Sequence, residues 1–218
     1  MRRRELLRGT GALVLVPGWT AAATAPRGRE VLALDQGWRF HEGDIPFPKI
    51  AGHGWTYANA KAGNAQGAAS PNFDDSEWPE VRLPHDFASF QPLERDANVS
   101  QGYRRRGIGW YRTALRLDPA ERGRHLELQI DGAATHATVW FNGTLVHHNF
   151  SGYNGMAIDL TPYASFGEAL NTVVVRVDAV AMEGWWYEGA GLYRGVRLVQ
   201  RAATHIATEG VFAHPVPR

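Results

Sequence analysis

Runs in which apolar and polar residues alternate recur along the chain from residue 109 onward. The clearest run places Leu126, Leu128 and Ile130 between polar neighbours. A period of two is typical of a strand with one buried face. Other short runs alternate in the same way or are apolar throughout, over residues 109–117, 137–141, 156–160, 173–177 and 196–198. Because turns separate these brief runs, they predict an antiparallel β-sandwich or jelly roll with very little helix.

The segments between the predicted strands carry turn residues. Asn142-Gly143 matches a two-residue hairpin turn, since both residues adopt positive φ at little cost. Thr161-Pro162 is expected to begin a short helical turn. A short strand is also expected over residues 38–40, before a stretch of Gly, Ala, Pro and Asn without any period at 43–80. That stretch predicts a long loop, and loops of this length usually carry function or stay mobile.

An aromatic loop lies between the last two predicted strands. The apolar run 173–177 ends in Asp178, and Trp185, Trp186 and Tyr187 follow, before a Gly-Ala-Gly turn. Aromatic faces and a carboxylate are what a pyranose needs, because the sugar has an apolar face and a ring of hydroxyls. The alternative is that these aromatic residues cap one end of the sandwich core. The spacing leaves both interpretations open.

Composition narrows the classes of partner. Of 218 residues, 23 are Lys or Arg and 22 are Asp or Glu, which gives a net charge of +1 and argues against nucleic acid or an anionic membrane. The absence of cysteine excludes disulfides, thiol catalysis and thiolate metal sites. His147 and His148 are adjacent on a predicted strand and point to opposite faces, so they are poor joint ligands. We therefore expect no metal and no cofactor, while eight tryptophans favour a carbohydrate partner.

Residues 1–25 have the features of an export signal. Arg3 and Arg4 are followed by Leu6 and Leu7, which resembles a twin-arginine motif, and the apolar run that comes next is too short to span a bilayer. An Ala-Thr-Ala sequence at 23–25 fits a cleavage site. The sequence predicts export to the periplasm or the outside of a bacterial cell, the alternative being a frayed basic tail.

Several fragments together resemble glycoside hydrolase family 2. In order along the chain they are LPHD at 83–86, GIGWYR at 107–112, VWFNG at 139–143, GY at 152–153, IDLT at 158–161 and WYEGAGLYR at 186–194. Each fragment alone is a weak signal, but their order and even spacing over about 110 residues resemble the family's N-terminal sugar-binding domain, as in β-galactosidases. The resemblance implies a galactose-binding-like jelly-roll β-sandwich over 26–203, with 204–218 as the start of a link to an immunoglobulin-like domain.

The same resemblance implies that the catalytic residues lie elsewhere. Members of the family place an acid/base and a nucleophile glutamate in a later eight-fold β/α barrel, and retaining glycosidases need two carboxyl groups about 5–5.5 Å apart. The chain has no Asn-Glu dipeptide like the one at the family's acid/base site. We therefore assign no catalytic residue, and we expect Glu183 and Glu188 to be solvated loop carboxylates or sugar contacts.

The resemblance also indicates which loops would face a sugar. One follows Asp86, and the other precedes the Gly-Ala-Gly turn, where Trp185 occupies a position that is an aspartate in some β-galactosidases and β-glucuronidases. We expect both loops at the same end of the sandwich, with Asp86, Asp178, Trp185, Trp186 and Tyr187 as candidate substrate-binding residues. Asp178 has the alternative role of ending its strand. Arg104, Arg105 and Arg106 are expected to be solvated or to contact a neighbouring domain, and Tyr193-Arg194 to hold the turn.

Three functions remain open at this point. The first is the N-terminal domain of a β-galactosidase-like enzyme, the second is a free-standing carbohydrate-binding module, and the third is a remnant without function. A binding module should present one exposed aromatic platform, whereas a domain that docks on others should have a larger exposed apolar face.

Overall fold

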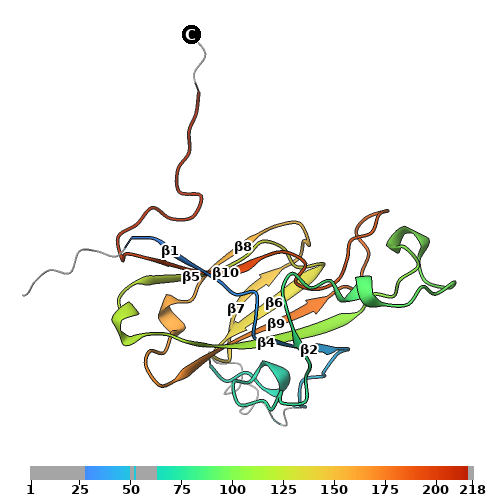
Figure 1. The fold of residues 1–218 in the computed structure, drawn as a ribbon, viewed down its shortest axis with the longest axis horizontal. Helices are drawn as coiled ribbons and strands as arrows, with labels where there is room; N and C mark the ends of the chain where they lie inside the picture. The colour runs from blue at the N-terminus through green and yellow to red at the C-terminus, as the bar shows by residue number, and fades with distance from the viewer. Residues whose placement is uncertain (1–27, 50–51, 53–62, 216–218) are drawn as a thin grey trace, which may run out of the picture.

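The structure, a computed structural model, describes residues 28–49, 52 and 63–215 and consists of two antiparallel sheets (Figure 1). The four-stranded sheet has the order β1 (Glu30–Ala33), β10 (Val196–Arg201), β5 (His125–Ile130) and β8 (Met156–Asp159). The six-stranded sheet has the order β3 (Glu80–Val81), β2 (Trp38–Glu42), β4 (Ile108–Arg116), β9 (Leu170–Asp178), β6 (His136–Phe141) and β7 (Thr144–Asn149). The predicted all-β jelly-roll sandwich is confirmed.

Helical structure in the described residues is limited to single 3₁₀ turns. These are η1 (Gly67–Ala69), η2 (Phe87–Phe90), η3 (Val99–Gln101), η4 (Pro119–Glu121) and η5 (Thr161–Tyr163). The last of them is the short turn predicted at Thr161-Pro162. Among the described residues, no helix has the length and apolar character needed to cross a membrane.

The main core lies between the two sheets and follows the predicted alternation. On β5, Leu126, Leu128 and Ile130 are completely buried, and they face residues of the other sheet such as Tyr111 and Val175. Burying each such side chain contributes about 1.5–3 kcal/mol relative to leaving it exposed. The Asn142-Gly143 hairpin is also confirmed, with φ of 50° and 74° at its two residues.

A second apolar cluster covers the outer face of the six-stranded sheet. Trp110 on β4 and Trp140 on β6 stack with ring centroids 5.7 Å apart, and both are buried. Residues of the predicted long loop, including Ala68, Ala69 and Trp78, cover them. The described part of this loop is therefore a packed layer over the sheet. Residues 50–51 and 53–62 of the loop lie outside the described residues, as does the predicted export signal at 1–25.

Candidate functional site

The two loops expected to face a sugar lie at the same end of the sandwich. One connects β3 to β4 and contains residues 82–107, and the other connects β9 to β10 and contains residues 179–195. Figure 1 shows them together at one end, coloured green and orange-red. The prediction that these segments share one end is confirmed, and several side chains join them directly.

Asp86 connects the two loops. One carboxylate oxygen caps η2 by accepting from the Ala88 amide at 3.1 Å, and the same oxygen accepts from the Ala190 amide at 2.8 Å. The other oxygen accepts from the Tyr187 hydroxyl at 2.7 Å. Burial and this hydrogen bond to Asp86 raise the pKa of Tyr187, so its hydroxyl stays protonated and donates. Asp86 thus fixes the Gly-Ala-Gly turn and the tyrosine beside it.

Gln101 is a second connection, and the sequence analysis missed it. Its side chain is buried, donates to the carbonyl of Trp186 at 2.8 Å and accepts from the amide of Glu188 at 3.1 Å. One amide group therefore satisfies two backbone groups on either side of Tyr187. A glutamine in a polar loop gives no local signal of such a contact, because its partners are more than 80 residues away.

A buried ion pair lies under the aromatic loop. The Arg106 guanidinium donates to the Glu188 carboxylate at 2.8 Å, and the two side chains are only 5% and 2% exposed. Arg106 also donates to Thr135 Oγ1 and to the carbonyls of Gly189 and Ala181. The carboxylate accepts in addition from the Glu183 amide at 3.2 Å.

This ion pair corrects two expectations. Glu188 is neither solvated nor available to a sugar, and Arg106 belongs to the interior of this domain, because each is needed to neutralise the other in a dry environment. Glu183 is partly exposed and lies 3.1 Å from His136. Arg105 follows the expectation of a solvated residue and pairs with Glu94 and Asp96 at the surface, while Arg104 donates to the Gln91 carbonyl.

The aromatic side chains themselves face solvent. Trp185 is 93% exposed and Trp186 is 58% exposed, and Tyr187 lies beside them above Asp86. The indole of Trp186 donates to the Tyr153 hydroxyl at 2.5 Å, which adds a residue from the β7–β8 loop to the group. We call Tyr153, Trp185, Trp186 and Tyr187 the aromatic rim. The alternative that these residues cap the core is wrong for Trp185, because a capping residue would be covered.

Asp178 lies apart from this group. It ends β9, where one carboxylate oxygen accepts from the Val180 amide at 3.1 Å and the other lies 3.3 Å from Arg176. Within the described residues, no hydrogen bond or ion pair joins Asp178 to Asp86 or Tyr187. The structure therefore favours the strand-ending role that the sequence left open for Asp178.

Other residues of the motifs have structural roles. Tyr193 donates to the Gly152 carbonyl at 2.8 Å, and Arg194 reaches the carbonyls of Asp131 and Tyr153, so both hold the turn as expected. His85 packs on Phe40 and lies 2.8 Å from the Tyr111 hydroxyl. Burial lowers the pKa of His85, which keeps the imidazole neutral near pH 7.

A shallow pocket of about 250 Å³ opens between the two loops. Asn98, Arg104 and Arg105 line one side, and Val180 and Met182 line the other. Enclosed small-molecule sites are usually larger, about 300–1,000 Å³. Its lining is polar and aliphatic, and no residue of the aromatic rim is part of it. Among the described residues, no group of three or more His, Asp or Glu side chains could hold a metal ion.

Comparisons with known proteins agree with this arrangement. A family model described as "Glycosyl hydrolases family 2, sugar binding domain" matches residues 89–202. The β-galactosidase BoGH2A of Bacteroides ovatus is 31% identical over 196 residues, which is 88% of this chain and 20% of that protein. A putative β-glucuronidase of Formosa agariphila is 31% identical over 144 residues, 65% of this chain and 14% of that protein.

Solved structures show the same relation. The crystal structure of a glycosyl hydrolase family 2 member from Bacteroides cellulosilyticus matches with a TM-score of 0.67 and 31% identity, over 78% of this chain and 20% of that one. A β-glucuronidase of Bacteroides uniformis matches with a TM-score of 0.65 and 26% identity, over 84% of this chain and 19% of that one. The match thus spans between 14% and 20% of the length of these relatives. The chain belongs to glycosyl hydrolase family 2, of which it carries the sugar-binding domain.

Proposed function

We propose that this domain supplies one edge of the substrate site of a β-galactosidase- or β-glucuronidase-type enzyme, and that the aromatic rim contacts the sugar. The observation that supports this most is the combination of exposed aromatic faces with a rigid base. Trp185 is almost fully exposed, yet the loop that carries it is held by Asp86, Gln101 and the Arg106–Glu188 pair. Several exposed aromatic faces gathered on a loop that is held in place form a surface suited to recognition, whereas a single exposed aromatic residue does not.

The proposal includes further domains of the same enzyme. Beside the rim lie exposed apolar side chains from both loops: Phe90, Leu93, Val99, Val180 and Met182. This is a larger apolar face than a single stacking platform requires, and it supports docking against another domain rather than a free-standing carbohydrate-binding module. We propose that a barrel with the two catalytic glutamates packs here, and that residues 204–218 begin the link to an immunoglobulin-like domain.

We expect the chain alone to bind sugars weakly, with a dissociation constant in the millimolar range at best. Stacking on one ring contributes about 0.5–1.5 kcal/mol beyond area burial, and a domain that supplies one edge of a site offers few other contacts. The measurement is a titration with galactose, lactose and glucuronate followed by tryptophan fluorescence. Trp185→Ala should abolish most of the response.

A matched control for this titration is Phe212→Ala, which removes an equally exposed aromatic side chain, 87% exposed, from the C-terminal tail. It should behave like the parent. If the fluorescence responds to none of the three sugars, and Trp185→Ala behaves like the parent, the rim has no sugar-binding role in this chain. A micromolar response would instead favour the free-standing module.

We also propose that the protein is exported in the folded state through a twin-arginine signal at residues 1–25. The Arg3-Arg4 pair and the Ala-Thr-Ala sequence that ends the segment support this. Replacing both arginines by lysine should retain the protein in the cytoplasm, as measured by cell fractionation of a bacterium that has this pathway. Unchanged export of the double variant would contradict the proposal.

A further inference from the structure

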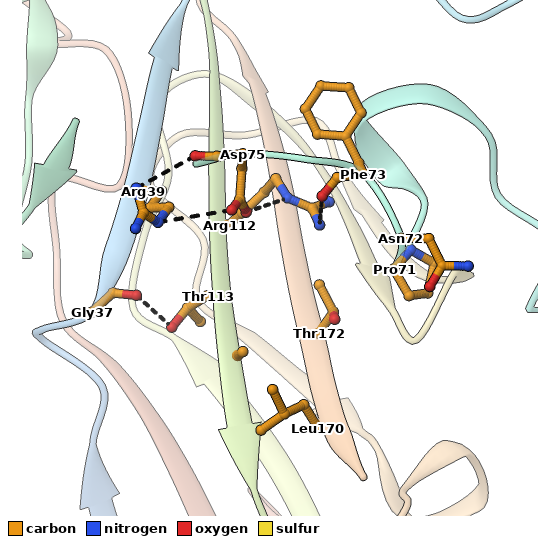
Figure 2. Close-up of a pocket in the computed structure, with 11 residues that line it drawn as sticks. Gly37, Arg39, Pro71, Asn72, Phe73, Asp75, Arg112, Thr113, Leu170 and Thr172 are labelled. Atoms are coloured by element: carbon orange, nitrogen blue, oxygen red, sulfur yellow. Dashed lines mark hydrogen bonds and ion pairs between the residues drawn. The ribbon is translucent and has the colours of Figure 1, made fainter. Parts of the chain in front are cut away.

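The outer face of the six-stranded sheet carries a pocket that the aromatic rim does not include. It has a volume of about 460 Å³, within the range of about 300–1,000 Å³ usual for small-molecule sites. Its floor is formed by β4 and β9, and one wall comes from residues 71–75 of the long loop (Figure 2). The pocket is separated from the end of the sandwich that carries the aromatic rim. Along β9, Thr172 in the pocket and Asp178 at that end are six residues apart, which corresponds to about 20 Å.

The wall of this pocket is held by a buried charge. Arg112 on β4 is only 3% exposed, donates to the carbonyls of Ala68 and Ser70, and pairs with Asp75 at 2.7 Å. Arg39 on β2 donates to the carbonyls of Ser76 and Trp78, at the other end of the same wall. Figure 2 shows Asp75 between the two arginines. These contacts fix the loop on the sheet, so the pocket is formed before any ligand arrives.

The groups left for a ligand are mostly neutral. Thr113 is not one of these groups, because its side chain lies on the same face of β4 as the buried Tyr111 and Leu115, where its hydroxyl donates to the Gly37 carbonyl at 2.8 Å. In the part of the chain that the structure describes, the side chains of Thr172 and Asn72 make no hydrogen bond, and both line the pocket. Ala114 and Leu170 are exposed beside them and form an apolar patch on the floor.

We propose that this pocket is a second saccharide-binding site, which takes one neutral pyranose unit. The Thr172 hydroxyl, the Asn72 amide and the exposed Arg39 guanidinium, beside a small apolar patch, complement a molecule that has hydroxyls along its edge and C–H groups on its face. Asp75 and backbone carbonyls take most donors of the two guanidinium groups, while the Arg39 side chain is 42% exposed and its Nη2 makes no hydrogen bond within the described residues, so it can donate to a sugar hydroxyl. The site would hold a sugar chain at a distance from the aromatic rim.

The test is a titration of the ¹⁵N-labelled chain with glucose, galactose, mannose and lactose at millimolar concentrations, followed by amide chemical shifts. Shifts are expected at residues 113, 114 and 170–172, and they should persist in Trp185→Ala, which separates this site from the rim. Ala114→Trp fills the pocket at an exposed position and should abolish them. Thr172→Val, which removes one hydroxyl without changing shape, should weaken binding about threefold to tenfold.

Thr138→Val is the matched control, because it makes the same replacement on β6, outside the pocket. The amide spectrum of each variant without sugar shows whether it is folded. If Ala114→Trp does not fold, the effect of Thr172→Val on binding decides the test. Shifts confined to residues 184–191, no shift with any of the four sugars, or unchanged binding in Thr172→Val would overturn the proposal. An absence of sugar-induced shifts at the aromatic rim, with shifts retained at residues 113, 114 and 170–172, would contradict the proposed function of the rim and support this second site.

Discussion

Replacing Glu188 by alanine should lower the free energy of unfolding by about 3–5 kcal/mol, the range observed when one partner of a buried ion pair is removed. The reason is the environment of Arg106, whose side chain is 5% exposed and pairs with Glu188 at 2.8 Å. Without the carboxylate, the guanidinium remains buried with only neutral acceptors, Thr135 and two carbonyls. Urea denaturation followed by tryptophan fluorescence and far-UV circular dichroism measures the change.

The same loop provides a matched control. Glu183 is also a glutamate and also contacts a basic side chain, His136, but its side chain is 36% exposed. Ion pairs open to solvent contribute about 0–1 kcal/mol, so Glu183→Ala should change stability by less than that. The double variant Arg106→Met with Glu188→Met should recover most of the loss, because it removes both charges at once. Equal stabilities for Glu188→Ala and Glu183→Ala would show that the pair is not buried in solution.

The strands could be predicted because a strand imposes its own period on the sequence. Leu126, Leu128 and Ile130 face the core only if their neighbours point away, and this alternation is visible without any knowledge of the partner strands. The Asn142-Gly143 turn was predictable for a similar reason, since positive φ at two successive residues restricts the choice of residue. Such local constraints account for most of the sandwich.

The long loop was harder to interpret because its order depends on distant residues. It has no period, and only the sheet face below it explains why Ala68 and Ala69 are buried. One signal was present in the strand itself. The sequence places Trp110 and Tyr111 side by side on β4, so that both faces of the strand carry a large aromatic residue. A strand with two aromatic faces indicates that something covers the outer face as well.

The candidate site was predictable only where residue type alone indicates a role. Exposed aromatic residues and Asp86 could be selected by type and by family resemblance, and the structure joins Asp86 to Tyr187. The supporting residues Gln101 and Arg106 could not, because a buried hydrogen bond or ion pair across 80 residues has no pattern in the sequence. Glu188 shows the opposite error: its position in an aromatic loop indicated exposure, while its real partner was an arginine far along the chain.

Gly191→Ala should lower the free energy of unfolding by about 2–6 kcal/mol, an effect comparable with that of Glu188→Ala, because the last glycine of the Gly-Ala-Gly turn has no room for a side chain. Its φ is +116°, and an added Cβ would lie 2.6 Å from the His85 carbonyl oxygen and in collision with the Tyr111 hydroxyl. Forcing an L-residue into such a conformation costs about 1–3 kcal/mol, and overpacking a closed site costs about 1–3 kcal/mol more. Thermal and urea unfolding of the variant measure the loss.

The effect should also reach the rim. The segment that the new methyl group would displace, at His85, leads directly into Asp86, which accepts from the Ala190 amide and from Tyr187. Any sugar response of Trp185 should therefore decline together with stability. Gly195→Ala is the control, since an added Cβ would have the Asp131 carboxylate at 3.3 Å as its nearest neighbour, with no backbone atom close to it, and the φ of Gly195 is not positive. That variant should stay within about 1 kcal/mol of the parent. If Gly191→Ala were equally mild, the turn would have to open in solution, and the aromatic rim would lose the rigid base on which its proposed function depends.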